Sequence, residues 1–256
     1  MRKFICIANQ KGGVGKTTTA INLSASLAAT EKRTLLIDCD PQGNASNGMG
    51  IESSLIDKKN LYHSLAGKVP LEDIIVSTQI PTLDIIPSNR DLIGVEVEFV
   101  SLPDREKRLK GLLRSMDTPH EFVIIDCPPS LGFLTINALV ASDHLIVPLQ
   151  CEYFAMEGLG YLLQTVRLIK TRLNPSLSLR GILLTMFDTR NRLSHRVAED
   201  VRSHFGERVF KTVIPRNVRL SESPSHGLPI ILYDIKSRGA ISYMELAKEI
   251  LSNGRI

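Results

Sequence analysis

Residues 5–18 read ICIANQKGGVGKTT, in which an apolar run ends in a glycine-rich loop and the loop ends in Lys16-Thr17-Thr18. Glycines let several backbone N–H groups converge on one anion, and the N-terminus of a following helix adds positive potential. The order of strand, loop and helix therefore predicts a phosphate-binding loop. Its predicted ligand-binding residues are Gly12, Gly13, Val14, Gly15, Lys16, Thr17 and Thr18.

The loop departs from the strict Walker A pattern, which has a glycine where this chain has Gln10. A second lysine, Lys11, stands at the entrance of the loop instead. Lys16 occupies the position that contacts the β- and γ-phosphates of a nucleotide, and the Thr17 hydroxyl is placed to coordinate Mg²⁺.

Carboxylates follow two apolar runs elsewhere in the chain. The strand predicted at residues 121–126 ends in Asp126, which is expected to hold Mg²⁺ through water, as a Walker B aspartate does. The strand predicted at residues 33–38 ends in Asp38, with Asp40 just beyond it. Asp40 is expected to orient the water that attacks the γ-phosphate, and Asp38 to act as an outer magnesium ligand.

Strands and helices alternate along the rest of the chain. Strands are predicted at residues 4–8, 33–38, 83–87, 121–126, 143–150, 179–187 and 209–214. Helices are predicted at residues 17–29, 61–65, 71–75, 91–100, 104–116, 133–140, 156–173, 194–205 and 242–251. This alternation predicts an α/β fold with a doubly wound, mostly parallel sheet flanked by helices. No linker divides the chain, so one domain over residues 1–256 is expected.

The bulk composition fits a globular protein, with 43% hydrophobic and 23% charged residues. The four cysteines are far apart and form no Cys-x-x-Cys pair, which argues against a zinc ribbon and favours a reducing, cytoplasmic environment. The N-terminus passes directly into the first strand, so no cleavable signal is expected. No apolar run has the length of a membrane span.

Three motifs together resemble the deviant Walker A ATPases. They are KGGVGKTT at residues 11–18, DCDPQG at residues 38–43 and DCPP at residues 126–129. The segment PRNVRLSESPSHG at residues 215–227 narrows the resemblance to the ParA/Soj chromosome-partitioning ATPases, and the similarity extends over nearly the whole chain.

That resemblance implies a weak ATPase that uses ATP and Mg²⁺. Lys11 would be the signature lysine, which reaches across an ATP-sandwich homodimer to the phosphates of the partner and so explains the misfit at Gln10. The family further implies contacts of Pro215 and Asn217 with adenine, and a ParB-type centromere-binding protein that stimulates hydrolysis. The N-terminal helix-turn-helix of longer family members is not expected here.

The C-terminal half carries the basic charge. Residues 167–219 contain 12 Lys and Arg against 4 Asp and Glu. Charge alone is compatible with a solvated basic surface. The resemblance favours non-specific binding of double-stranded DNA by the ATP-bound dimer, and hence association with the nucleoid. The residues expected to contact DNA are Arg190, Arg216 and Arg219.

Three other classes of protein remain as alternatives. A MinD-like, membrane-cycling ATPase would need a C-terminal amphipathic helix, but the apolar stripe of residues 242–251 is expected to pack on the core. An iron–sulfur reductase would need cysteines that bridge a dimer, whereas Cys39 and Cys127 are expected to pack at strand ends. A binding module without activity would not need Lys16, Thr17, Asp40 and Asp126 together.

Overall fold

Strand β1 (Lys3–Ile7) lies inside a seven-stranded sheet with the order β3-β4-β2-β5-β1-β6-β7. The computed structural model describes residues 2–252. All neighbouring strands pair in parallel except β3, which is antiparallel to β4. The other strands are β2 (Thr34–Asp38), β3 (Val76–Ser77), β4 (Leu83–Ile86), β5 (Phe122–Asp126), β6 (His144–Gln150) and β7 (Ser178–Thr185). The predicted doubly wound, mostly parallel sheet is confirmed.

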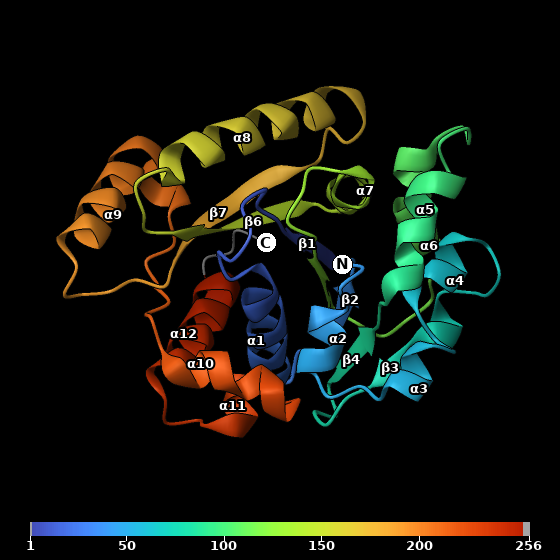
Figure 1. Cartoon of the computed structure of the whole chain (residues 1–256), viewed down its shortest axis with the longest axis horizontal. Helices are drawn as coiled ribbons and strands as arrows, with labels where there is room; N and C mark the ends of the chain where they lie inside the picture. The colour runs from blue at the N-terminus through green and yellow to red at the C-terminus, as the bar shows by residue number, and fades with distance from the viewer. Residues whose placement is uncertain (1, 253–256) are drawn as a thin grey trace.

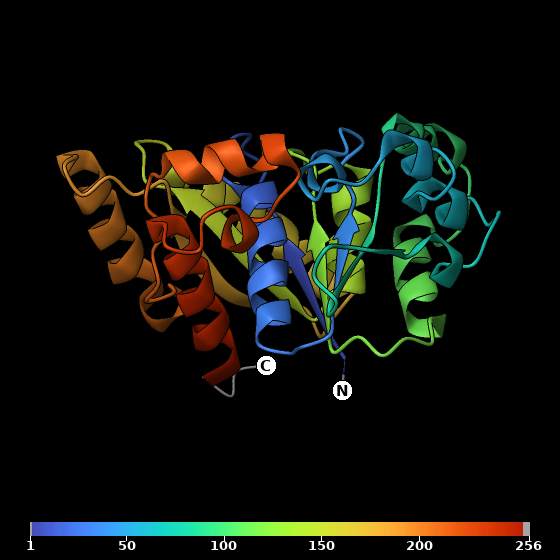
Figure 2. The same cartoon turned by 90° about the horizontal axis from the view of Figure 1, so that it is seen from below.

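Helices cover both faces of the sheet (Figures 1 and 2). Side chains alternate along β1, so Ile5 and Ile7 join one hydrophobic core while Cys6 joins the other. On the Ile5 face lie α1 (Lys16–Ala29), α11 (Ile230–Tyr233) and α12 (Arg238–Ser252). On the Cys6 face lie α4 (Leu61–Leu65), α5 (Ile93–Glu98), α6 (Arg108–Ser115), α7 (Phe133–Ala141), α8 (Ala155–Arg172) and α9 (Arg192–Phe205).

The apolar stripe of α12 is buried, as the sequence predicted. Tyr243, Leu246, Ala247 and Ile250 lie in the core beside α1. The Tyr243 hydroxyl is within 3.2 Å of the Thr19 hydroxyl on α1, so a polar contact also joins the two helices. Within residues 2–252, no helix is long and apolar enough to cross a bilayer.

One predicted strand is wrong and several short elements were missed. Residues 209–214 run beside β7 but form only isolated bridges, such as Ile182 with Val209. The backbone N–H groups of Lys211 and Thr212 donate instead to the Glu249 carboxylate on α12, at 2.8 and 2.9 Å. The Glu249 side chain therefore takes the place of the hydrogen bonds that a neighbouring strand would make. Only the tertiary structure brings Glu249 next to residues 211 and 212.

Residues 71–75 were predicted as a helix and form only the 3₁₀ turn η1 (Glu72–Ile74). Short helices were missed where the sequence has polar turns. They are α2 (Asn44–Gly48), α3 (Ser53–Ile56) and α10 (Val218–Glu222), together with α11 and the 3₁₀ turns η4 (Gly206–Arg208) and η5 (Ser223–His226). Such segments span about one turn, too little for a hydrophobic period to show. The 3₁₀ turns η2 (Arg90–Leu92) and η3 (Arg105–Lys107) form the starts of the helices predicted at residues 91–100 and 104–116.

The chain order opens a crevice where β1 and β5 end side by side. From β1 the chain crosses through α1 to β2 on one side, and from β5 it crosses through α7 to β6 on the other side. Register places Ile7 beside Asp126, and Asp126 beside Asp38 at the end of β2. Open α/β sheets bind their ligands at such a switch point, so the fold itself brings the predicted site residues together.

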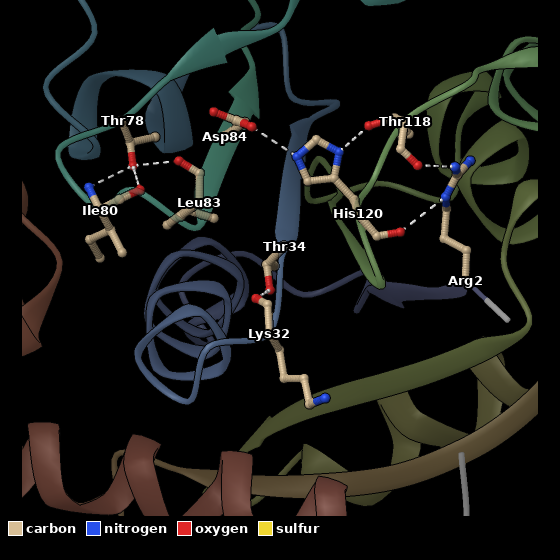
Figure 3. A network of polar contacts seen from close by, with 9 residues as sticks. All are labelled: Arg2, Lys32, Thr34, Thr78, Ile80, Leu83, Asp84, Thr118 and His120. Atoms are coloured by element: carbon tan, nitrogen blue, oxygen red, sulfur yellow. Dashed lines mark hydrogen bonds and ion pairs between the residues drawn. The ribbon is translucent and has the colours of Figure 1, made fainter.

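A polar network around His120 lies at the end of the sheet opposite the predicted site, where β1, β4 and β5 begin (Figure 3). The His120 ring contacts the Thr118 hydroxyl on one side and Asp84 on the other, with 2.9 Å from Nε2 to Oδ2. Arg2 donates to three backbone carbonyls of the same loop, those of Met116, Thr118 and His120. The hydrogen bond from His120 holds the pKa of Asp84 below its ordinary value.

Replacing Asp84 by Asn is therefore expected to lower the free energy of unfolding by about 1–2 kcal/mol, because the protein loses a charge-assisted hydrogen bond to a buried ring. A lowered carboxyl pKa contributes stability above the pKa of the unfolded chain, near 4, and this contribution is lost as the pH falls through the folded value. Urea unfolding at pH 7 and at pH 3 measures the difference between the proteins.

The matched control is Asp104→Asn, which removes an exposed ion pair with Lys107. This variant is expected to stay within about 0.5 kcal/mol of the parent protein. Equal stabilities for Asp84→Asn and the parent at pH 7 would contradict the assigned role of the network.

Candidate functional site

The loop between β1 and α1 has the backbone of a phosphate cradle. Gly13 and Gly15 adopt positive φ angles of 73° and 87°, which side chains with a Cβ rarely adopt. Gly15 caps α1, so the loop leads directly into a helix N-terminus. The Val14 carbonyl accepts a 2.8 Å hydrogen bond from the Thr185 hydroxyl at the end of β7, which anchors the loop to the sheet.

The Lys16 side chain folds back across this loop. Its Nζ donates to the Lys11 carbonyl at 2.9 Å, and the residue is only 6% exposed. Burial lowers the pKa of Lys16, while the charges of Asp126, Cys127 and Asp40 oppose that effect. The ammonium therefore lies among carboxylates at the mouth of the loop, where it can meet an incoming anion.

A cavity of about 270 Å³ opens over the loop. Asp40 contributes to its wall together with the predicted phosphate residues, so the structure brings these side chains to one place. The lining residues are Gly12, Gly13, Gly15, Lys16, Thr17, Thr18, Asp40, Asn44, Pro129 and Met186. Val14 is buried behind this surface.

Asp38 and Asp126 are neighbours in register and both are fully buried. Burial raises the pKa of Asp38 to about 6, although hydrogen bonds from Ser46 and Asp40 oppose the shift. Burial, together with the charge of Asp38, also raises the pKa of Asp126 well above its ordinary value. Two carboxylates placed this close together without solvent favour a bound cation or a bound proton.

The hydrogen bonds of the two carboxylates separate their roles. Asp38 accepts from the Asp40 N–H at 3.1 Å, and from the N–H and hydroxyl of Ser46 at 2.9 and 2.7 Å. Neither oxygen of Asp126 has a well-formed hydrogen bond to any residue that the structure describes, although the Thr17 hydroxyl is near enough to favour its charged form. Asp126 thus has both oxygens available for a metal, whereas Asp38 holds the following loop.

That loop is fixed around Asp40 by two serines that the sequence did not single out. The Ser46 hydroxyl, which donates to Asp38, accepts from the Ser88 N–H at 2.9 Å. The Ser88 hydroxyl donates to the Asp40 carbonyl at 2.9 Å. Asp40 also accepts from the Gln42 N–H, so its carboxylate is held at the cavity wall.

A second cavity, of about 450 Å³, adjoins the first and shares Gly15, Thr18 and Met186 with it. Pro215 and Asn217, the predicted adenine contacts, line it. Asn217 caps α10 by accepting from the Leu220 N–H at 3.3 Å, so its position is fixed by the local fold. The larger cavity has apolar side chains such as Ile214, Leu220 and Tyr243 in its wall, and the smaller one has the phosphate cradle, so together they offer an apolar end and an anion-binding end.

Met186 was not predicted as a site residue. It lines both cavities with a φ of 50°, which is uncommon for a residue other than glycine. Its only sequence signal is its place directly after the last residue of β7, at the edge of the sheet where ligands bind.

Lys11 does not line either cavity. Its ammonium is paired with the Glu152 carboxylate, in the segment between β6 and α8 of the same chain. Nothing in the sequence marked Glu152, because the two residues are 141 positions apart. The role of Lys11 toward phosphates therefore stays a prediction.

The basic segment forms more than one group of charges. Arg190 and Arg216 are exposed near the same carboxylate, and the hydrogen bond from Arg190 and the charge of Arg216 lower the pKa of Asp188. Arg216 also lines the larger nucleotide cavity. Arg219 is exposed and pairs with Glu222 at 3.0 Å and with Asp234 at 3.6 Å.

Other arginines of the segment lie at the far edge of the sheet. Arg180 and Arg208 line a separate cavity beside His144 and Ser178, the first residues of β6 and β7. With about 3.3 Å per residue, the length of β7 places this edge more than 20 Å from the phosphate loop. The count of 12 basic residues therefore overstates the charge of any single surface.

The cysteines are buried, as predicted for Cys39 and Cys127. The Sγ atoms of Cys6 and Cys127 are 3.3 Å apart inside the core. Among residues 2–252 no group of three His, Cys, Asp or Glu side chains is arranged to hold a metal ion. The cysteines thus offer no surface ligands for a cluster shared between two copies.

A glycine-rich loop that lacks the first Walker glycine, a Walker B-type aspartate and a pair of adjoining cavities over the loop define a P-loop protein of the deviant Walker A class. A family model described as an AAA domain matches residues 2–179. The chain is 54% identical over 254 residues to the sporulation initiation inhibitor protein Soj of Bacillus subtilis, covering 99% of this chain and 100% of that protein.

The chromosome partitioning protein ParA of Myxococcus xanthus is 53% identical over 97% of this chain and 88% of its own length. A solved structure of cobyrinic acid a,c-diamide synthase from Mycobacterium smegmatis, with bound ADP and magnesium, superposes with a TM-score of 0.87 at 36% identity. It covers 100% of this chain and 96% of that chain. The chain belongs to the ParA/Soj family of chromosome-partitioning ATPases.

We expect Asp126→Asn to stabilise the metal-free protein at pH 8 by about 1–3 kcal/mol, because it removes an uncompensated buried charge. A raised carboxyl pKa contributes stability at low pH, and this is lost as the pH rises from about 4 through the folded value. The variant should therefore lose less stability than the parent between pH 5 and pH 8 in thermal unfolding without metal.

The control for this prediction is Asp73→Asn, which changes the charge equally at an exposed position. It should follow the parent protein across the same pH range. If Asp126→Asn is the less stable protein at pH 8, the carboxylate is compensated and our interpretation of its environment is wrong.

Proposed function

We propose that this protein is an ATP-dependent DNA-partitioning ATPase, acting in the segregation of a chromosome or plasmid. The observation that carries the proposal is the buried Asp126 carboxylate, which faces Lys16 and Thr17 beneath a nucleotide-shaped cavity. Chromosome-partitioning relatives more than half identical over nearly the whole chain support the same function.

Mg-ATP is the proposed ligand of the two cavities. Thr17 and Asp126 would hold Mg²⁺, with Asp38 as an outer ligand, and the ion would neutralise charge on the phosphates. Lys16 and the N–H groups of the loop would bind the phosphates, while Pro215 and Asn217 would contact the adenine. Bound ADP and magnesium in a 36% identical structure support this choice of ligand.

Hydrolysis is assigned to Asp40 and Lys11. Asp40, held by the Ser88 contact and aimed along the cavity wall, would orient the attacking water. Lys11 would come from a second copy of the chain and stabilise the charge on the transferred phosphoryl group. A single chain supplies only part of the positive charge that would stabilise the transferred phosphoryl group. We therefore propose a weak intrinsic rate that a ParB-type partner increases.

Two copies joined around ATP would also switch DNA binding. Arg190, Arg216 and Arg219 are exposed, Arg216 lines the larger cavity, and a dimer would double the number of these arginines. Binding through phosphates depends on such local charge and carries no sequence preference. We therefore propose a cytoplasmic protein that associates with the nucleoid while it holds ATP.

The DNA assignment predicts a specific salt dependence. For a duplex of arbitrary sequence, we expect binding with a non-hydrolysable ATP analogue and Mg²⁺, and much weaker binding with ADP or without nucleotide. Arg219→Ala should weaken binding and lower the slope of log K against log salt by about 1 for each DNA phosphate that the arginine neutralises in the parent protein. Fluorescence anisotropy at several salt concentrations measures both quantities.

Arg208→Ala is the matched control, because it removes an arginine from the same basic segment at the far edge of the sheet. It should leave the slope unchanged. An equal decrease of affinity in both variants would show that the DNA-binding surface lies elsewhere. Sedimentation with anionic liposomes, run beside the DNA assay, tests the membrane-cycling alternative directly.

The role of Asp40 predicts that Asp40→Ala binds Mg-ATP but does not turn it over, and so accumulates as a dimer. Size-exclusion chromatography with light scattering, together with phosphate release, measures both properties. A variant that hydrolyses ATP at the parent rate, or that remains a monomer in saturating Mg-ATP, would contradict the assignment.

A further inference from the structure

The entrance of the phosphate loop is attached to one neighbouring segment, residues 148–158, at three successive positions. The Asn9 amide donates to the Pro148 carbonyl at 2.8 Å, and the Gln10 amide donates to the Gly158 carbonyl at 3.3 Å. Lys11 pairs with Glu152 between these two contacts. This segment joins the end of β6 to the first turn of α8. A shift of α8 would therefore also move the entrance of the phosphate loop.

The contact with Glu152 determines what Lys11 can do in a single chain. The ammonium is paired with a carboxylate of its own chain, and Lys11 lies outside the residues that line the phosphate cavity. The backbone of Lys11 is also fixed, since its N–H donates to Asn9 and its carbonyl accepts from Lys16. Only the side chain of Lys11 is therefore left to move when Glu152 is displaced.

The pair is accessible to a second molecule. Its two side chains are 42% and 34% exposed. Tyr153 and Phe154 follow Glu152 directly, pack edge to face at 5.0 Å, and are 77% and 63% exposed. An incoming surface that carries a triphosphate would thus meet Lys11, Glu152 and this aromatic pair together.

The Lys11–Glu152 ion pair is expected to be weak enough for a bound triphosphate to break it. Exposed ion pairs shift an equilibrium by a factor of about 1.4 to 5, and added salt screens them. A triphosphate carries several negative charges, so it can replace one carboxylate as the partner of Lys11.

We propose that Glu152 is a positioning residue that holds Lys11 on its own chain until the nucleotide of a second copy takes its place. This inference rests on the proposed function, because it assumes that Lys11 acts across a dimer. To the proposed function it adds Glu152 as the residue that regulates dimerisation. Breaking the Lys11–Glu152 pair becomes part of the cost of dimerisation, and a change in the β6–α8 segment alters that cost.

The test is Glu152→Gln, which keeps the shape of the side chain and removes its charge. The control is Glu121→Gln, which removes the same charge from an exposed pair with Lys32 at the far edge of the sheet. The dissociation constant of the dimer is measured by analytical ultracentrifugation with a non-hydrolysable ATP analogue and Mg²⁺. A dimer breaks two Lys11–Glu152 pairs, one in each copy. We expect association of Glu152→Gln to tighten by about two- to five-fold for each pair, a gain that shrinks as salt rises, and no change for Glu121→Gln.

A second measurement does not depend on dimerisation. Labelling of lysines by an amine-reactive reagent, followed by mass spectrometry, is carried out on the full chain without nucleotide. In Glu152→Gln the labelling rate of Lys11 should rise by a similar factor, about two- to five-fold, while Lys107, which is paired with Asp104, serves as the internal reference.

The outcomes separate the inference from the function on which it rests. If the parent protein does not associate in Mg-ATP analogue, the proposed dimer switch fails, whatever the labelling shows. If the parent associates and Glu152→Gln associates equally or more weakly, Glu152 does not restrain Lys11. Unchanged Lys11 labelling, or an equal gain in Glu121→Gln, also overturns the inference.

Discussion

The burial of two carboxylates beside one ammonium is the constraint on which the nucleotide end of the sheet depends. Asp38 and Asp126 end adjacent strands and are fully buried, and Lys16 is the cation that faces Asp126 across the loop. Buried charges are costly unless they are paired or hydrogen-bonded. Asp38 meets this requirement through hydrogen bonds from Ser46 and the Asp40 backbone. Among residues 2–252, Asp126 accepts no well-formed hydrogen bond, and the charge of Lys16 only partly opposes the effect of its burial. The protein without ligand thus carries a local instability that a cation relieves.

The same arrangement couples the parts of the site to one another. Asp38 holds Ser46, Ser46 accepts from the Ser88 backbone, and the Ser88 hydroxyl holds the segment of Asp40. On the other side, the entrance of the loop is attached to residues 148–158 through Asn9, Gln10 and Lys11. Hydrogen bonds and an ion pair therefore connect the phosphate loop and Asp38 both to Asp40, the proposed hydrolytic carboxylate, and to the exposed segment before α8.

Particular elements show where sequence reasoning succeeded and where it failed. The central strands β2 and β5 are short apolar runs, buried on both faces, that end in Asp38 and Asp126. Such runs can be predicted from the local sequence without knowing which strands pair with them. Residues 209–214 have the same apolar character, but Glu249 takes two of their backbone donors, so no regular strand forms. The basic segment was interpreted as one cluster, yet β7 carries Arg180 to the edge of the sheet away from the nucleotide.

The sequence by itself determined the α/β class, the phosphate loop and most residues of the cavity over that loop, because those properties depend on local backbone geometry and on the order of strands and helices. The tertiary structure decided which charges meet. Among residues 2–252 it left both Asp126 oxygens without a well-formed hydrogen bond, gave Asp38 three hydrogen bonds, and brought Glu152 to Lys11 across 141 positions of sequence. Pairing between distant side chains depends on how the chain packs, and no local pattern records it. The loop entrance, where Gln10 replaces the first glycine of the strict motif and Lys11 follows it, is the place where the two kinds of information meet.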